Sequence, residues 1–219
     1  MYRKQVKIGG REKKKDCVIM AEEKEIEFKN LLNEQEYRQL LQTYCNLDTP
    51  FFVQTNHYFD TPDWELKKQH MGLRIRLKEE YAEYTLKSPL DDQQGLLETT
   101  EVFSNEKANE LINTASLPQM GEVADKLTTF KISVDSLRLI GSLKTKRCEI
   151  KLDNTHLLVL DESWYGNCHD YELELETVSY DEGKRYFKLL LDKHHLIQRP
   201  VQNKVVRMIE ATHASDAHK

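Results

Sequence analysis

The sequence predicts an α+β protein in which strands dominate, arranged as an antiparallel barrel or a strongly curved sheet with helices packed outside. Three observations predict this fold. Nine segments alternate apolar with polar or charged side chains, as strands with one buried face do. Turn residues at Asp153-Asn154 and Tyr165-Gly166-Asn167 join neighbouring segments closely enough for hairpins. Helical patterns are few and do not follow each strand, as they would in a parallel sheet.

The helices are expected between the strands. The capping-box pattern Asn33-Glu34-Gln35-Glu36, followed by apolar residues at helical spacing, predicts a helix from Asn33 to about Leu47. Ser179 and Glu182 repeat that spacing and predict a helix with an apolar face through Phe187 and Leu190. Two further helical patterns run from Ser104 to about Ala115 and from Gly121 to about Thr128.

The expected strands share one property: polar side chains alternate with apolar ones, so that each kind lies on its own face. The strands are Lys24–Asn30, Phe52–Asp60, Leu73–Glu79, Glu83–Ser88, Leu96–Phe103, Leu143–Asp153, His156–Glu162, Asp170–Thr177 and Val201–Ile209. No internal repeat or low-complexity linker divides them, which indicates a single domain over residues 20–211.

Several expected strands place rows of charge on one face. The pentad Glu25-Ile26-Glu27-Phe28-Lys29 aligns two carboxylates with an ammonium, and Leu73-Arg74-Ile75-Arg76-Leu77 aligns two guanidiniums. Tyr171-Glu172-Leu173-Glu174-Leu175-Glu176 aligns three carboxylates, which repel one another unless cations intervene. Further cations are Lys87, Lys146, Arg147, Lys204 and Arg207.

These rows have two interpretations. Each row by itself matches the solvated face of an open sheet. Together the rows favour a closed sheet, because the signs are segregated by strand whereas a solvated surface mixes them. In a closed sheet the charged face, including Glu25 and Glu27, lines the lumen, and Ile26 and Phe28 point outward. Such a lumen suits a polyphosphate with a divalent metal, since cations bind its oxygens and carboxylates bind the metal.

Composition narrows the class of protein. The 219 residues are 39% hydrophobic and 32% charged, and no apolar run approaches the ~20 residues of a membrane-spanning helix. The four cysteines have no Cys-x-x-Cys spacing and follow no signal peptide, which favours a cytoplasmic protein over a disulfide or zinc scaffold.

Charge divides the chain into a basic arm and an acidic body. Residues 1–19 carry a net charge of +5, whereas the whole chain carries −5 and the remainder therefore −10. The arm is expected to lie outside the core fold, as is a tail at residues 212–219. The acidic body argues against nucleic-acid binding, in which phosphate neutralisation dominates the affinity. No membrane partner is expected, and a homodimer is left open.

Eight short motifs follow one another along the chain: Glu25-x-Glu27-x-Lys29, Tyr58-Phe59-Asp60-Thr61-Pro62, Leu73-Arg74-Ile75-Arg76, Thr85-Leu86-Lys87, Leu97-Glu98, Thr145-Lys146-Arg147, Leu160-Asp161 and Tyr171-Glu172-Leu173-Glu174-Leu175-Glu176. Their order, over about Met20 to Ala211, resembles that of the CYTH superfamily, also called triphosphate tunnel metalloenzymes. Within it the chain is most similar to the stand-alone CYTH-domain proteins of Gram-positive bacteria.

The resemblance implies a tunnel of eight antiparallel strands that holds a triphosphate and Mg²⁺ or Mn²⁺. It implies catalytic roles for Glu25, Glu27, Lys29, Arg74 and Arg76. The implied phosphate-binding residues are Lys29, Arg74, Arg76, Lys87, Arg147 and Lys204. The implied metal ligands are Glu25, Glu27, Glu98, Asp161 and two of Glu172, Glu174 and Glu176. Glu101 is an alternative to Glu98, because an insertion or deletion would exchange them.

The activity that the resemblance implies is metal-dependent hydrolysis of a triphosphate, either inorganic or organic. Two alternatives stay open. One is a class IV-type adenylate cyclase that forms cAMP from ATP, although no motif identifies an adenine pocket. The other is a non-catalytic module that binds a polyphosphate or nucleotide.

Overall fold

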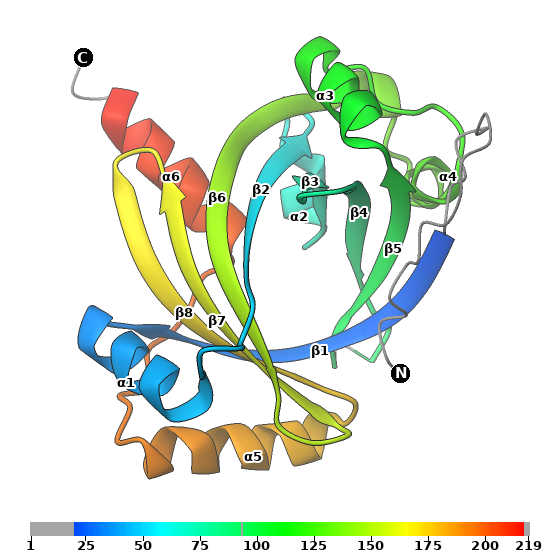
Figure 1. The fold of residues 1–219 in the computed structure, drawn as a ribbon. Coiled ribbons are helices and arrows are strands. Elements are labelled where there is room, and N and C mark those ends of the chain that lie inside the picture. Colours follow the sequence, from blue (N-terminus) through cyan, green and yellow to red (C-terminus); the bar gives the residue numbers. More distant parts are fainter. Residues whose placement is uncertain (1–19, 93, 217–219) are drawn as a thin grey trace, which may run out of the picture.

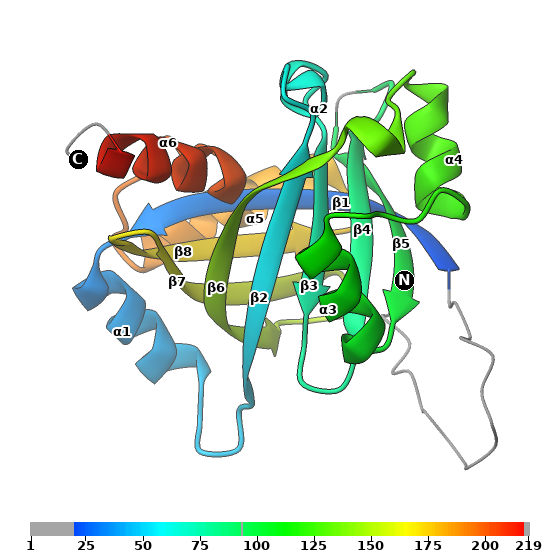
Figure 2. The ribbon, with the colours of Figure 1, turned by 90° about the horizontal axis from the view of Figure 1, so that it is seen from above.

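The structure, a computed structural model, describes residues 20–92 and 94–216. Eight strands close into an antiparallel barrel in the order β1-β5-β4-β3-β2-β6-β7-β8, and β8 pairs back to β1 (Figure 1, Figure 2). The helices lie outside the barrel, which confirms the predicted fold class. The basic arm at residues 1–19 lies outside the described residues.

The eight strands of the barrel and the four expected helices appear in the expected order, with bounds that differ by a few residues, whereas the short helix at Glu65–Lys68 and the 3-10 turn were not expected. The strands are β1 (Met20–Leu32), β2 (Phe51–Asp60), β3 (Gly72–Leu77), β4 (Ala82–Pro89), β5 (Leu96–Phe103), β6 (Arg138–Lys151), β7 (His156–Tyr165) and β8 (Cys168–Thr177). The helices are α1 (Glu34–Tyr44), α2 (Glu65–Lys68), α3 (Asn105–Thr114), α4 (Glu122–Thr129), α5 (Tyr180–Lys193) and α6 (Lys204–Asp216), with a 3-10 turn at Val134–Ser136.

One expected element is wrong: the segment Val201–Ile209 is not a ninth strand, because helix α6 begins at Lys204. Val205, Met208 and Ile209 have the i, i+3, i+4 spacing of a helical apolar face. They lie against the barrel near Tyr58 and the adjoining wall of β6. The helix runs on to Asp216 and packs across one end of the barrel (Figure 2).

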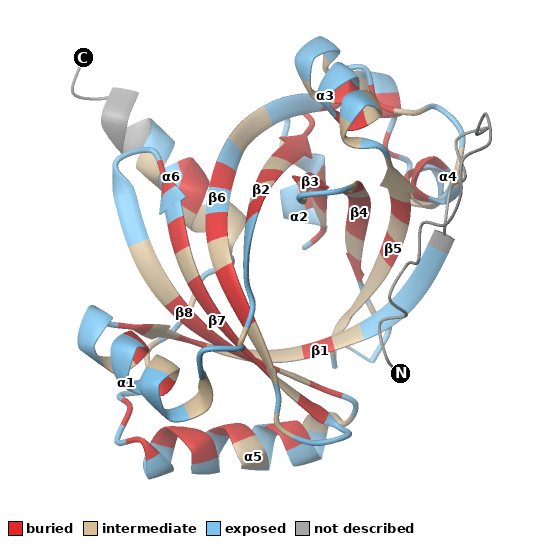
Figure 3. Cartoon of the chain, viewed as in Figure 1, coloured by how far each residue is buried: buried red, intermediate tan, exposed pale blue. Residues whose placement is uncertain are grey.

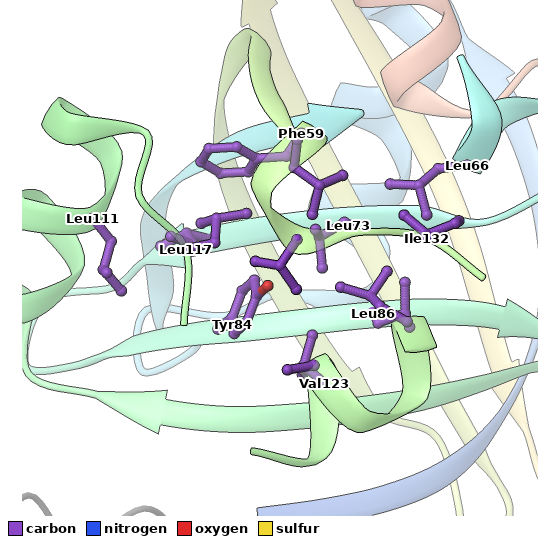
Figure 4. Packing of buried hydrophobic residues seen from close by; sticks show 14 of the residues in the cluster. Phe59, Leu66, Leu73, Tyr84, Leu86, Leu111, Leu117, Val123 and Ile132 are labelled. Carbon is purple, nitrogen blue, oxygen red and sulfur yellow. The ribbon is translucent and has the colours of Figure 1, made fainter. Parts of the chain in front are cut away.

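The hydrophobic core lies between the outer barrel surface and the helices. Under α3 and α4 the side chains of Tyr84, Leu86 and Val123 point toward one another (Figure 4). A second cluster lies under α1 and α5, where Phe28 packs on Phe187 with ring centroids 5.9 Å apart. In Figure 3 buried residues run along β7 and β8 beside these helices. Under these helices the apolar side of the strands therefore faces outward, which leaves the charged side for the lumen.

Helix α5 approaches the barrel closely at Gly183. A Cβ at this position would lie 2.3 Å from Thr177 Cγ2 and 2.8 Å from the Phe28 ring. We expect Gly183→Ala to lower the free energy of unfolding by about 1–3 kcal/mol, because overpacking outweighs the better helix propensity of alanine.

Urea unfolding measures this loss, and Gly72→Ala is the matched control. A Cβ at Gly72 would meet no atom within 4 Å, so this variant should change stability by less than about 0.5 kcal/mol. Equal stabilities of the two alanine variants would contradict the close packing of α5.

None of the helices in the described part of the chain is long and apolar enough to span a membrane.

Candidate active site in the barrel tunnel

The barrel encloses a cavity of about 350 Å³. Its wall contains inward side chains from every strand, and α2 and α6 flank it. Ten of the residues expected in the site line this cavity: Glu25, Glu27, Lys29, Arg74, Arg76, Lys87, Arg147, Asp161, Glu174 and Lys204. The strand alternation thus places nine of these residues, and helix α6 places Lys204, around one space.

The first charged cluster joins β1, β3, β4 and β5. Lys29 Nζ lies 2.5 Å from Glu27 Oε1, and Lys87 pairs with Glu25. Lys87 Nζ also lies 2.9 Å from Glu98 Oε1, which in turn is 3.4 Å from Arg74 Nη2. Each carboxylate in this cluster therefore has a cationic partner from a neighbouring position in the barrel.

The second cluster lies on β6, β7 and β8, and it adjoins the first cluster where β8 pairs with β1. Arg147 binds Asp161 through two hydrogen bonds of 2.8 and 2.6 Å, donated by Nε and Nη2. Its Nη2 also donates to Glu174 Oε2 at 2.8 Å. Asp161 is fully buried, so this forked geometry holds both carboxylates in fixed positions.

Helix α6 contributes to the second cluster through Lys204, which was expected in the site but on a strand, and through Arg207. Lys204 Nζ lies 2.6 Å from Asp161, 2.9 Å from Glu172 and 2.5 Å from Glu174. Arg207 Nη2 donates to Glu172 at 2.6 Å. In a strand, residues 204 and 207 would face opposite sides, whereas the helix brings both to one carboxylate.

The three glutamates of β8 have different surroundings. Glu172 is fully buried between Lys204 and Arg207, and burial raises its pKa to about 6. Burial would also raise the pKa of Glu174, but Lys204 and Arg147 hold that pKa well below its ordinary value. Glu176 stands opposite Glu27 in the β1–β8 register. Of the three, Glu174 lines the cavity.

The structure distinguishes Glu98 from Glu101, which lie on opposite faces of β5. Glu98 faces the tunnel and pairs with Lys87 and Arg74. Glu101 faces outward and accepts a hydrogen bond of 2.9 Å from the Val123 N–H at the start of α4. The geometry therefore favours Glu98 over Glu101 as the acidic residue of this strand in the tunnel.

Stability should depend on pH through Glu98. Burial would raise its pKa, but Lys87 and Arg74 outweigh burial and hold the pKa far below the ordinary value of 4.5. A carboxyl with a lowered folded pKa stabilises the protein above its unfolded pKa, and this contribution is lost as pH falls. We expect Glu98→Gln to lower the free energy of unfolding by about 2–3 kcal/mol at pH 7 and by less at pH 3.5.

Urea unfolding at the two pH values checks this expectation. Glu110→Gln, at a solvent-exposed i,i+3 pair with Lys107, is the control and should change stability by less than about 0.5 kcal/mol at either pH. A larger effect of Glu98→Gln at pH 3.5 than at pH 7 would contradict the lowered pKa.

The two β3 arginines keep unused capacity for an anion, although Glu98 lies 3.4 Å from Arg74 and Glu83 lies 3.6 Å from Arg76. Arg74 Nε is buried and has no hydrogen-bond partner among the described residues. Burial lowers the pKa of Arg76 to about 10, and the nearby charges of Arg74 and Arg147 add to this effect. An anion between these guanidiniums would supply the missing acceptor and offset the repulsion.

Strand β2 and helix α2 complete the wall with residues that the charge rows do not reveal. Asn56 Oδ1 accepts a hydrogen bond of 2.8 Å from Arg76 Nε and thereby orients its guanidinium. Asp60 accepts hydrogen bonds from the backbone N–H groups of Thr61, Leu66 and Lys67, at 2.7 to 3.1 Å. Asp60, part of the Tyr58–Pro62 motif, thus fixes α2 beside the cavity.

The donor set is suited to a hard divalent cation. Glu25, Glu27, Asp161 and Glu174 offer carboxylate oxygens to the cavity, the ligands that Mg²⁺ and Mn²⁺ prefer. Burial raises the pKa of Glu25 against the effect of Lys87, and the charges of Glu27 and Glu98 add to the rise. A divalent cation would relieve that repulsion. In the described chain no three such side chains already form a ligand cluster, because lysines and arginines occupy their oxygens.

Comparison with known proteins identifies the family of this barrel. The CYTH domain model matches residues 23–209. The chain belongs to the CYTH family. The match covers all eight strands from residue 23 of β1 onward, together with the part of α6 that carries Lys204 and Arg207.

Two relatives and one distant structure illustrate the similarity of this CYTH chain. It is 40% identical over 191 residues to YjbK of Bacillus subtilis (strain 168), which is provisionally named a triphosphatase. The alignment covers 87% of this chain and 97% of YjbK. A Bacillus halodurans protein provisionally named an adenylate cyclase is 38% identical, with a TM-score of 0.79 over 85% of this chain and 97% of that one.

The more distant structure is HpAC1 from Hippeastrum, a provisional adenylyl cyclase described as having a dominant triphosphatase activity. It is 21% identical and has a TM-score of 0.72, over 84% of this chain and 94% of HpAC1. At this identity the similarity concerns the fold alone.

Proposed function

We propose that this CYTH protein hydrolyses the terminal phosphoanhydride bond of a triphosphate in its tunnel, with Mg²⁺ or Mn²⁺. The observation that carries the proposal is the unpaired, buried Nε–H of Arg74 together with the poorly compensated charge of Arg76, both of which face the cavity from β3. Planar guanidiniums on one strand face suit the oxygens of adjacent phosphates. The name of YjbK agrees with this activity.

The basic residues reach the cavity from several elements. Arg74 and Arg76 lie side by side along β3 and would bind neighbouring phosphates. Lys29, Lys87, Arg147 and Lys204 reach the cavity from other elements, each already paired with a carboxylate. On substrate binding these cations would exchange part of their carboxylate contacts for phosphate oxygens and stabilise the charge on the phosphoryl group and leaving diphosphate.

The carboxylates would hold the metal. Glu25 and Glu27 from β1, Asp161 from β7 and Glu174 from β8 line the cavity. The bound metal would neutralise phosphate oxygens and lower the pKa of the attacking water. Burial of these carboxylates keeps their charge from being screened by solvent, so their attraction for the cation is strong.

Adenylate cyclase activity is the second candidate, because one side of the cavity is apolar. Leu66 and Met71, at α2, and Val206, from α6, line it beside the charged wall. Such a surface could receive an organic group attached to the triphosphate. The Bacillus halodurans relative carries the name of this activity.

A substrate panel tests both candidates. The purified full chain is incubated with inorganic triphosphate, ATP, GTP, thiamine triphosphate and long-chain polyphosphate, with Mg²⁺, Mn²⁺ or EDTA, and orthophosphate and cyclic nucleotide are measured. We expect orthophosphate release that EDTA abolishes. Formation of cAMP from ATP without orthophosphate would favour the cyclase. Binding of triphosphate without turnover under either metal would overturn catalysis and favour a binding module.

A further inference from the structure

Two thiols from distant parts of the chain meet outside the tunnel. Cys45 Sγ and Cys148 Sγ lie 3.2 Å apart, although 103 residues separate them in the sequence. Both are free cysteines in this structure. Thiols at this distance share a weak hydrogen bond and need only a small movement to form a covalent bond.

The two thiols differ in access and reactivity. Cys45 ends helix α1 and is half-buried, so it is the more exposed of the two cysteines. Cys148 is fully buried on the outer face of β6, in the apolar cluster under α1 and α5. Burial raises the pKa of the Cys148 thiol to about 12. An oxidant therefore meets Cys45 first, and Cys148 stands directly behind it.

We propose that Cys45 and Cys148 form a redox modification site, a dithiol that hydroperoxides convert into an intramolecular disulfide. The proposal rests on the geometry of the two thiols and does not depend on the activity proposed for the tunnel.

The chemistry proceeds in two steps. The Cys45 thiolate attacks one oxygen of hydrogen peroxide, the O–O bond breaks, and the products are a sulfenic acid and hydroxide. The Cys148 sulfur then attacks the Cys45 sulfur, the S–O bond breaks, and water leaves with the Cys148 proton. In total two thiols lose two electrons and two protons, and one peroxide becomes two molecules of water.

The surrounding structure permits this bond. A disulfide of about 2.05 Å requires the sulfurs to approach by roughly 1.1 Å. Cys45 begins the connection between α1 and β2, so its side chain can move while β6 stays in the sheet. The bond would fasten the end of α1 to β6 directly behind Arg147, which holds Asp161 and Glu174 in the tunnel.

The test uses the full chain with Cys17→Ser and Cys168→Ser, so that Cys45 and Cys148 are the remaining thiols. After treatment with hydrogen peroxide we expect a monomer about 2 Da lighter, loss of both free thiols in denaturant, and their return on adding dithiothreitol. Peptide mapping without reductant should show the Cys45–Cys148 link. The oxidised chain should melt roughly 5–10 °C above the reduced chain.

Two matched controls complete the experiment. Adding Cys45→Ser or Cys148→Ser to the same background should remove both the lighter species and the rise in melting temperature. Three results would overturn the proposal: both thiols stay reduced, each oxidises separately with a gain in mass, or the disulfide joins two chains instead of closing within one.

Discussion

Replacement of Arg76 by methionine is expected to lower kcat/KM for triphosphate by about 10²- to 10³-fold without loss of stability. The Arg76 side chain is 95% buried, and its guanidinium faces the cavity from β3. Its nearest carboxylate, Glu83, is 3.6 Å away, and its main hydrogen bond is to the neutral Asn56. Its charge is therefore poorly compensated within the protein and available for a phosphate.

The same imbalance predicts the effect on folding. Burial and the charges of Arg74 and Arg147 lower the pKa of Arg76 to about 10, so the folded state disfavours its charged form at pH 7. Removing the charge should leave the free energy of unfolding unchanged or raise it by about 1–2 kcal/mol, after the lost Asn56 hydrogen bond is included.

Steady-state phosphate release and urea unfolding measure the two effects. Arg38→Met is the matched control, because Arg38 pairs with Glu34 on the exposed surface of α1. It should retain turnover and stability. Full activity of Arg76→Met, or destabilisation of about 3 kcal/mol or more, would refute the view that this guanidinium serves the substrate instead of the fold.

The barrel could be predicted from the sequence because its strands obey a period of two over most of their length. In β1 the alternation assigns Glu25 and Glu27 to one face and Phe28 to the other, and the packing of Phe28 on α5 confirms which face is outside. The helix near the C-terminal end, α6, could not be predicted from this alternation. Around Lys204 and Arg207 the apolar residues satisfy a short alternating pattern and a helical one, and packing against β6 decides for the helix.

The alternation of the strands predicts many residues of the candidate site, but it does not predict which charged side chains pair with one another. Charge rows indicate which residues share a face, whereas the pairing of Arg147 with Asp161 depends on the register between β6 and β7. Asn56 was missed as a site residue because it carries no charge. Arg207 was noted as a cation of the last charged row but was not assigned to the site, to which the helix brings it. The period-two rule itself separates Glu98 from Glu101, since three positions along a strand reverse the face.

Lys204 links the fold of α6 to the electrostatics of the tunnel. Its ammonium lies within 2.9 Å of three carboxylates, of which Asp161 and Glu172 are fully buried. Arg147 and Arg207 also donate hydrogen bonds to these carboxylates, so three cations balance three carboxylates. Removing one cation leaves buried negative charge without compensation, which costs more than the net contribution of the intact cluster.

We therefore expect Lys204→Met to lower the free energy of unfolding by about 3–5 kcal/mol at pH 7 in EDTA. Mg²⁺ or Mn²⁺ should recover part of this loss, because a divalent cation takes the place of the ammonium among the carboxylates. Urea unfolding with EDTA and with each metal measures both effects. Lys188→Met, on the exposed side of α5, is the control and should show neither. Wild-type stability of Lys204→Met in EDTA, or a metal response no larger than that of the unmodified chain, would show that the ammonium does not balance this charge.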